Sequence, residues 1–101
     1  MHIQLNHDVE VFIASLEKPT IAKVLRTIDL LERFGHQLGM PHSKRVNRDL
    51  HELRIRGQQE VRIFYTLKRG SAYLLHGFIK KSPRIPLREI EQAERKMRGL
   101  T

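Results

Sequence analysis

The chain has 101 residues, 40% of them hydrophobic, and carries 19 lysines and arginines against 11 aspartates and glutamates, for a net charge of +8, with no cysteine. The missing cysteines exclude disulfides, thiolate zinc sites and cysteine nucleophiles, and no apolar stretch approaches the roughly 20 residues that a membrane-spanning helix needs. We therefore expect a single domain over residues 1–101 with no membrane partner, and because no secretion signal is visible we expect it to be cytoplasmic.

Two helices are predicted in the first third of the chain. Asp8 can cap a short helix whose apolar residues fall near helical spacing and which ends before Pro19. From Ile21 to Phe34 apolar residues recur at three- and four-residue steps until Gly35 interrupts them, which predicts a second helix. Pro19 suits the first turn of that helix, where its missing amide hydrogen costs nothing. We expect the two helices to form an antiparallel hairpin at the N-terminus.

Three strands are predicted after an irregular segment. Residues 35–47 contain glycine, proline and basic residues without a sustained period, and we interpret them as a loop. The segments that follow alternate or are rich in β-branched and aromatic residues, with short turns between them, which predicts an antiparallel meander. The last of the three is apolar on both sides, which is typical of a strand covered on both faces, so we expect it to be central. The three segments are residues 50–56, 61–67 and 72–79.

A final helix completes the predicted fold. Pro83 and Pro86 interrupt the chain after the third strand, and apolar residues at helical spacing then predict a helix from about Leu87 to Arg98. Together the elements predict an α+β fold in which an N-terminal helical hairpin packs on a small antiparallel β-sheet, with a C-terminal helix.

Positive charge is concentrated in the second part of the chain. Residues 1–38 carry four basic and five acidic side chains, whereas residues 39–101 carry fifteen basic and six acidic ones. A localised positive field favours a polyanion, because cations that contact phosphates release condensed counterions. A solvated basic face, or a patch that binds an acidic protein partner, would have the same composition, so both stay alternatives to nucleic acid.

Arginines gather on one face of the predicted sheet. Alternation puts Arg54 and Arg56 on the polar face of the first strand and Arg62 on that of the second. Guanidinium groups on adjacent strands suit bidentate contact with phosphate oxygens. We expect Arg62 to lie outside the core, so that its replacement by alanine leaves the fold intact. The alternative for Arg56 and Arg62 is that they are exposed and form surface ion pairs with Glu52 or Glu60.

Histidines and tyrosines offer few further candidates for catalysis. His76 is the only histidine inside a regular apolar strand; it suits proton transfer, but its apolar neighbours favour a hydrogen-bonded core residue. His42 lies in the predicted loop and is a better candidate for substrate contact than for catalysis. Tyr65 and Tyr73 are the only tyrosines, and both are expected in the core. The other histidines show no metal-ligand spacing, so we expect no metal and no other cofactor.

Several short runs resemble a known family when they are taken together. In order and spacing, over about residues 9–97, the chain is similar to the phage-derived, HigB-type toxins of the RelE/ParE superfamily. The resemblance implies a helical hairpin packed on a small antiparallel sheet. It also implies that the chain is the toxin of a type II toxin-antitoxin system, and that this toxin cleaves messenger RNA on the ribosome without a metal ion. The implied partner is a cognate antitoxin, often of the helix-turn-helix type. The runs are Leu38–Lys44, Glu52–Arg54, Val61–Tyr65, Leu75–Lys81 and Pro86–Arg95.

The resemblance also implies roles for particular residues. It implies phosphate contacts for Arg56 and Arg62, and proton transfer or phosphate stabilisation for Lys80 and Lys81, with Lys81 preferred. The alternative for the two lysines is contact with the ribosomal RNA backbone without chemistry. No tyrosine or histidine follows His76, although better-studied relatives have one in this segment, so the general acid stays open. Further RNA contacts are expected at Lys44, Arg45, Arg48, Arg54 and Arg84.

Two other functions stay open beside messenger RNA cleavage. The same superfamily includes gyrase poisons, and a shared fold does not choose between the two targets. A non-catalytic module that binds nucleic acid or an antitoxin would use the basic face for binding alone.

Overall fold

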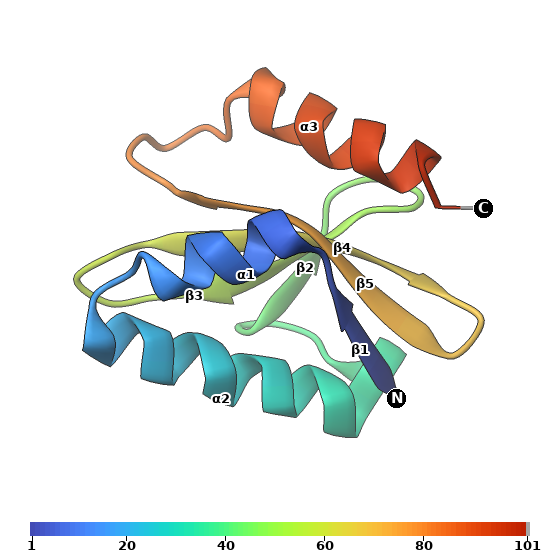
Figure 1. Ribbon diagram of the computed structural model, residues 1–101, viewed down its shortest axis with the longest axis horizontal. Helices are drawn as coiled ribbons and strands as arrows, with labels where there is room; N and C mark the ends of the chain where they lie inside the picture. The colour runs from blue at the N-terminus through green and yellow to red at the C-terminus, as the bar shows by residue number, and fades with distance from the viewer. Residues whose placement is uncertain (101) are drawn as a thin grey trace.

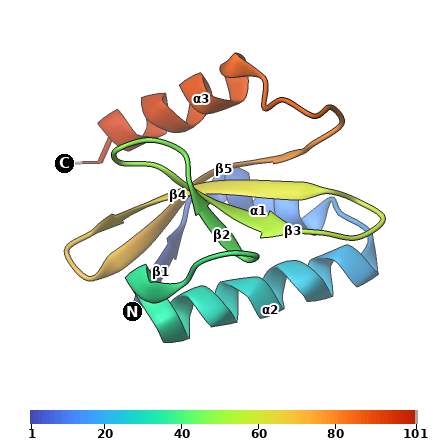
Figure 2. The ribbon, with the colours of Figure 1, turned by 180° about the vertical axis from the view of Figure 1, so that it is seen from behind.

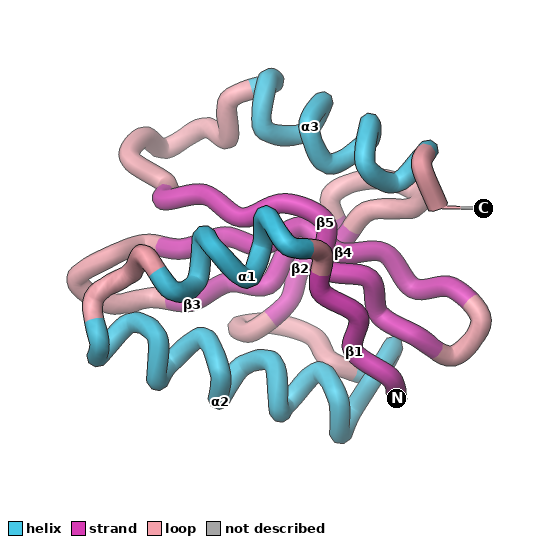
Figure 3. Tube along the Cα trace, viewed as in Figure 1, coloured by secondary structure: helices cyan, strands magenta, loops and turns pink. Residues whose placement is uncertain are grey.

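A five-stranded mixed sheet forms the middle of the computed structural model, which describes residues 1–100. The strands lie in the order β1-β5-β4-β3-β2, and every neighbouring pair is antiparallel except β1 and β5, which are parallel. Figure 3 shows the strands in magenta and the helices in cyan. In chain order the elements are β1 (His2–Leu5), α1 (His7–Ala14), α2 (Lys18–Phe34), the short 3-10 helix η1 (Gly35–Gln37), β2 (Ser43–Arg45), β3 (His51–Ile55), β4 (Val61–Lys68), β5 (Ser71–Ile79) and α3 (Leu87–Arg98).

The helices cover both faces of the sheet. In Figure 1 and Figure 2, α3 lies on one side of the sheet, and α1 and α2 lie on the other. Each side has its own buried cluster, so the fold has three layers and two cores. Within residues 1–100 no helix combines the length and the apolar character that crossing a membrane requires. The core under α1 and α2 includes Val9, Val24, Leu31, Ile63 and Leu74, and the core under α3 includes Leu50, Phe64, Leu75, Phe78 and Ala93.

The predicted N-terminal helical hairpin on a small antiparallel sheet is wrong, because the chain begins with a strand. β1 pairs in parallel with β5, so α1 and α2 follow a strand and the sheet is mixed. The segment 35–47, predicted as a loop, contains the other edge strand, β2. β1 has four residues and β2 has three, too few to carry a local pattern, and both are defined by their pairing with β5 and β3.

The other predicted elements are confirmed in place and type. The three predicted strands coincide with β3, β4 and β5 to within one residue at each end, and the predicted final helix coincides with α3. Pro19 lies in the first turn of α2. Gly35, with a positive φ of 56°, ends that helix, since a residue without a side chain adopts this backbone conformation without strain.

Asn6, rather than the predicted Asp8, caps α1. Its Oδ1 accepts a hydrogen bond from the amide of Val9 at 2.8 Å. Its Nδ2 donates to the carbonyl oxygen of Leu75 at 2.9 Å. The same side chain therefore satisfies the start of α1 and fixes that start to β5.

β5 is an interior strand with a bulge opposite β4. It lies between β1 and β4 and contacts α1 and α3, as expected for a strand covered on both faces, although the middle strand of the five is β4. The register passes from Phe64 opposite His76 to Tyr65 opposite Leu74, so Leu75 is an extra residue. Leu75 packs in the core under α3, and His76 also contacts that helix. The bulge therefore turns two successive side chains toward α3 and breaks the alternation of the sequence.

Helix α1 approaches β5 closely at Gly77. A Cβ atom added at Gly77 would lie 2.5 Å from Cδ2 and 2.6 Å from Cε2 of the Phe12 ring. Phe12 is half-buried and packs on the core under α1 and α2. The missing side chain of Gly77 is therefore what lets the aromatic ring rest on the sheet.

Gly77→Ala should lower the free energy of unfolding by about 1–3 kcal/mol, because the new methyl group overlaps the Phe12 ring in a packed interior. In a Phe12→Ala background the same change should cost much less, since the clash is gone. Gly39→Ala is the matched control, because a Cβ atom there meets nothing within 4 Å. Urea unfolding measures all these variants. A Gly77→Ala protein as stable as the Gly39→Ala protein would contradict the contact.

Candidate nucleic-acid interface

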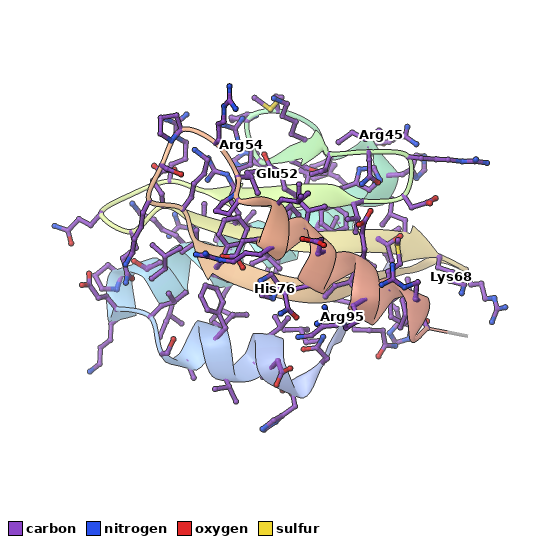
Figure 4. The ribbon with its side chains drawn as sticks, turned by 90° about the horizontal axis from the view of Figure 1, so that it is seen from above. Arg45, Glu52, Arg54, Lys68, His76 and Arg95 are labelled. Carbon is purple, nitrogen blue, oxygen red and sulfur yellow. The ribbon has the colours of Figure 1, made fainter. Side chains whose placement is uncertain are left out.

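Four charged side chains meet on the face of the sheet that carries α3. Glu52 and Arg54 extend from β3 and Arg62 from β4, where Arg62 is the register partner of Arg54. Oε1 of Glu52 lies 3.6 Å from Nε of Arg54 and 3.9 Å from Nε of Arg62. Nη1 of Arg62 also donates to Oε2 of Glu60 at 3.2 Å, so two carboxylates hold this arginine. Figure 4 shows Glu52 and Arg54 close to each other on β3.

Arg62 is a buried residue, with 3% of its surface exposed, and Glu52 has 5%. The prediction that Arg62 lies outside the core is wrong, because its register partners Arg54 and Phe78 flank it on both sides in the interior of the sheet. Arg62 does pair with Glu52 and Glu60, but its guanidinium is buried, so these are not the surface ion pairs of the alternative. Nε of Arg54, Nε of Arg62 and Oε2 of Glu52 have no hydrogen-bond partner within residues 1–100. Glu52 is therefore held to its two arginines by charge attraction, whereas Arg62 also has its hydrogen bond to Glu60.

The end of β5 and the β3–β4 turn bring three predicted catalytic residues together. The amide of Lys80 donates to the carbonyl oxygen of Glu60 at 2.7 Å, which ties the end of β5 to the turn. Arg56 stands at the start of that turn with 68% of its side chain exposed, and its Nε lies 3.6 Å from Oε1 of Glu60. Nζ of Lys80 donates to the carbonyl oxygen of Ser82 at 2.8 Å, and Lys81 is exposed. We call Arg56, Lys80 and Lys81 the basic end.

The residues predicted to contact RNA do not form one surface. In Figure 4, Arg54 lies nearer the β3–β4 turn, whereas Arg45 lies toward the opposite end of the sheet. Nη2 of Arg45 donates to the carbonyl oxygen of Arg48 at 2.6 Å, so this guanidinium is engaged within its own turn. Lys44 is exposed beside them, and Arg84 is exposed in the loop between β5 and α3. RNA contact by any of these residues stays a prediction.

A cleft of about 290 Å³ opens between α2 and β3. Two of its cations, Lys23 and Arg26, carry no sign of a site in the sequence, because exposed cations on an amphipathic helix ordinarily form its solvated face. They are three residues apart and so share one side of α2, but only the tertiary structure brings that side to β3. We call this the α2–β3 cleft. Its lining residues are Lys23, Arg26, Thr27, Leu30, Pro41, His42, Arg54, Ile55 and Arg56.

His76 fastens α3 to the sheet. Its Nε2 lies 2.8 Å from Oε1 of Glu89, and both side chains are partly buried. Lys96 makes a second tie from α3, with Nζ 3.0 Å from Oδ2 of Asp8 on α1. That hydrogen bond, together with the charge of Lys96, lowers the pKa of the Asp8 carboxyl. These contacts favour the structural interpretation of His76, and a catalytic role for it stays a prediction.

His51 and Tyr65 stack on each other across β3 and β4, with ring centroids 5.2 Å apart. Tyr65 is 1% exposed and shares a hydrogen bond with Oγ of Ser43 at 2.5 Å, which confirms it as a core residue. Burial raises the pKa of the Tyr65 hydroxyl, although the bond to Ser43 opposes this. Burial lowers the pKa of the His51 imidazole, and the positive charge of Arg45 adds to the effect. The fold therefore favours the uncharged form of both rings.

Carboxylates near the basic end are paired with arginines rather than grouped with one another. Among residues 1–100, no three histidine, aspartate or glutamate side chains lie close enough to hold a metal ion together. Chemistry without a metal or another cofactor stays a prediction.

The family model described as Phage derived protein Gp49-like (DUF891) matches residues 11–98. The match begins within α1 and continues to the end of α3. No curated protein matches the sequence. The basic end and the α2–β3 cleft both lie within the matched residues.

Arg62→Ala should lower the free energy of unfolding by about 3–5 kcal/mol, because it leaves Glu52 buried without one of its cations. Arg56→Ala is the matched control, since that side chain is 68% exposed and its loss should change stability by under about 0.5 kcal/mol. Denaturant unfolding compares the two variants with the parent. Equal stabilities would show that the buried ion pairs do not hold the sheet together.

The stability contribution of His51 should decline below about pH 6.5, the ordinary pKa of histidine. Its folded pKa lies below that of the unfolded chain, so the contribution is complete above pH 6.5 and is lost as the pH falls through the folded pKa. His51→Gln should remove this dependence. The free energy of unfolding of parent and variant is measured at about pH 7.5 and about pH 5. A difference that does not change with pH would contradict the prediction.

Proposed function

The chain belongs to the Phage derived protein Gp49-like family, and on that premise we propose that it is the toxin of a type II toxin-antitoxin system. Membership of this family is compatible with such a toxin. More narrowly, we propose a HigB-type member of the RelE/ParE superfamily that cleaves messenger RNA on the ribosome, with a helix-turn-helix antitoxin as its partner. The observation that carries the proposal is the basic end, where Arg56, Lys80 and Lys81 come from two segments tied by a hydrogen bond.

The proposed reaction depends on cations that stabilise a phosphate. A base removes the proton of the 2′-hydroxyl, the 2′ oxygen attacks phosphorus, the bond to the 5′ oxygen breaks, and an acid gives that oxygen a proton. Negative charge increases on the phosphate oxygens during the step, and preorganised donors stabilise it. The exposed groups of Arg56 and Lys81 supply such donors. Lys80, whose Nζ is held by the carbonyl oxygen of Ser82, supports them.

In this proposal Arg62 does not contact the phosphate, although such contact is the role that the family resemblance implies for it. With 3% of its surface exposed and two carboxylates around it, Arg62 positions the neighbouring cations rather than contacting the phosphate. Arg54, which shares Glu52 with it, is one of the residues that line the α2–β3 cleft. Since His76 is tied to α3, a lysine of the basic end is left to donate the proton to the departing oxygen.

Lys81→Ala and Arg56→Ala should each slow cleavage of ribosome-bound RNA by around 100- to 1,000-fold, the usual loss when one preorganised donor is removed. Both side chains are exposed, so the melting temperature should change little. Arg95→Ala, on the exposed side of α3, is the matched control and should keep the parental rate. Primer extension on a ribosome-bound transcript measures cleavage, and thermal unfolding measures stability.

Parental cleavage rates in both variants would contradict the assignment of the basic end. Growth arrest with intact transcripts would contradict messenger RNA cleavage itself. Double-strand DNA breaks with an SOS response would then indicate a gyrase poison, and their absence would indicate a non-catalytic binding module.

A further inference from the structure

The α2–β3 cleft has four cations and a histidine among its lining residues and no carboxylate. Two of the cations, Lys23 and Arg26, form no ion pair in the part of the chain that the structure describes. Arg54 of β3 and Arg56 of the turn that follows it also line the cleft, and their guanidiniums are paired with Glu52 and Glu60 respectively. The positive charge of Lys23 and Arg26 therefore lies on a concave surface with no carboxylate among its lining residues, which favours an anionic ligand.

Lys23 is held at the side of the cleft by the β3–β4 turn. Its Nζ donates to the carbonyl oxygen of Arg56 at 3.3 Å. Gly57 permits this approach, because a Cβ atom at that position would lie 2.7 Å from Nζ. A lysine ammonium has three donor hydrogens, so one contact with the turn fixes its position and leaves the others for a ligand.

Apolar walls lie among these cations. Leu30 of α2 and Pro41 line the cleft, and so does His42, the residue that follows Pro41. The volume of about 290 Å³ is close to the lower end of the ~300–1,000 Å³ typical of ligand pockets, so one small unit of a polymer fits. An unstacked base can lie against apolar side chains and a histidine ring while its phosphate meets the cations.

We propose that the α2–β3 cleft binds one unstacked nucleotide of a single-stranded RNA, with its phosphate on Lys23 and Arg26 and its base against Leu30 and Pro41. The inference rests on the proposed function. Arg56 belongs both to the cleft and to the basic end, so a strand that leaves the cleft passes directly to the proposed site of cleavage. This continuity favours RNA over an acidic peptide, which would use the cations but has no need of the basic end.

The test measures binding of a short 2′-O-methyl RNA to the intact protein by fluorescence anisotropy. This probe cannot be cleaved, because its blocked 2′ oxygen cannot attack phosphorus. Lys23→Ala combined with Arg26→Ala should weaken binding by about 10- to 100-fold, the usual effect of losing charged hydrogen bonds, and should make binding less sensitive to salt. Both side chains are exposed, and an unchanged melting temperature verifies that the variant folds.

Two further variants distinguish binding in the cleft from binding through the overall positive charge of the protein. Lys18→Ala combined with Arg33→Ala removes the same charge from exposed positions of the same helix outside the cleft, and should keep RNA affinity within about 2-fold of the parent. Gly57→Ala keeps every charge but displaces the ammonium of Lys23, and should weaken binding by a few-fold. An abasic phosphodiester oligomer of the same length should bind the parent more weakly than the RNA does.

Several results would overturn the proposal. Equal losses in the two double variants would mean that overall charge suffices. If Lys23→Ala combined with Arg26→Ala binds RNA normally but no longer binds polyglutamate, the cleft is a site for an acidic peptide. If the parent binds the abasic oligomer as tightly as the RNA, the cleft does not bind a base. Cleavage is measured separately, so the two proposals can fail independently. A parent that cleaves RNA while its cleft variants bind RNA normally overturns this inference alone, and a parent that binds RNA through the cleft without cleaving it overturns only the proposed function.

Discussion

Strand β4 is buried on both faces, and the arrangement of charge in the molecule follows from that burial. Residues 61–66 are buried without interruption, with Phe64 in the core under α3. Arg62 lies on that same face, so its guanidinium enters the interior of the sheet, where a cation without a partner is costly. Glu52 from the neighbouring strand and Glu60 from the preceding turn provide the opposite charge. Both carboxylates are therefore needed beside β4 to neutralise the buried guanidinium of Arg62.

Glu60 connects this buried group to the exposed cations. One carboxylate oxygen accepts from Arg62 at 3.2 Å, the other lies 3.6 Å from Nε of Arg56, and its carbonyl oxygen accepts from the amide of Lys80 at 2.7 Å. A single residue thus joins the interior of the sheet, the β3–β4 turn and the end of β5. The residues of the basic end follow directly on paired strands and are linked through Glu60, which favours preorganised stabilisation of a phosphate.

The local sequence pattern predicts helices and strands that have a clear hydrophobic period. It fails where an element depends on pairing with, or burial by, a segment far away in the chain. β3, β4, β5 and α3 are predicted closely, whereas β1 owes its strand conformation to β5, with Ile3 opposite Ala72. Alternation assigns Arg62 to a polar face, but that face carries the core under α3, and the neighbours that bury Arg62, on β3 and β5, are not part of the pattern. Lys23 and Arg26 show the same limit, since helical spacing puts them on one side of α2 without indicating that β3 lies opposite.

Burial divides the cations of this fold into two kinds. Arg62 is neutralised by two carboxylates and stabilises the sheet, whereas Lys23, Arg26 and Lys81 have no ion pair within residues 1–100. With a net charge of +8, unneutralised cations repel one another and destabilise the free protein, although physiological salt screens charges more than about 8 Å apart. A bound polyanion removes this repulsion and releases its own counterions at the same time. The groups that weaken the unbound fold are therefore the groups that would give an anionic ligand its affinity.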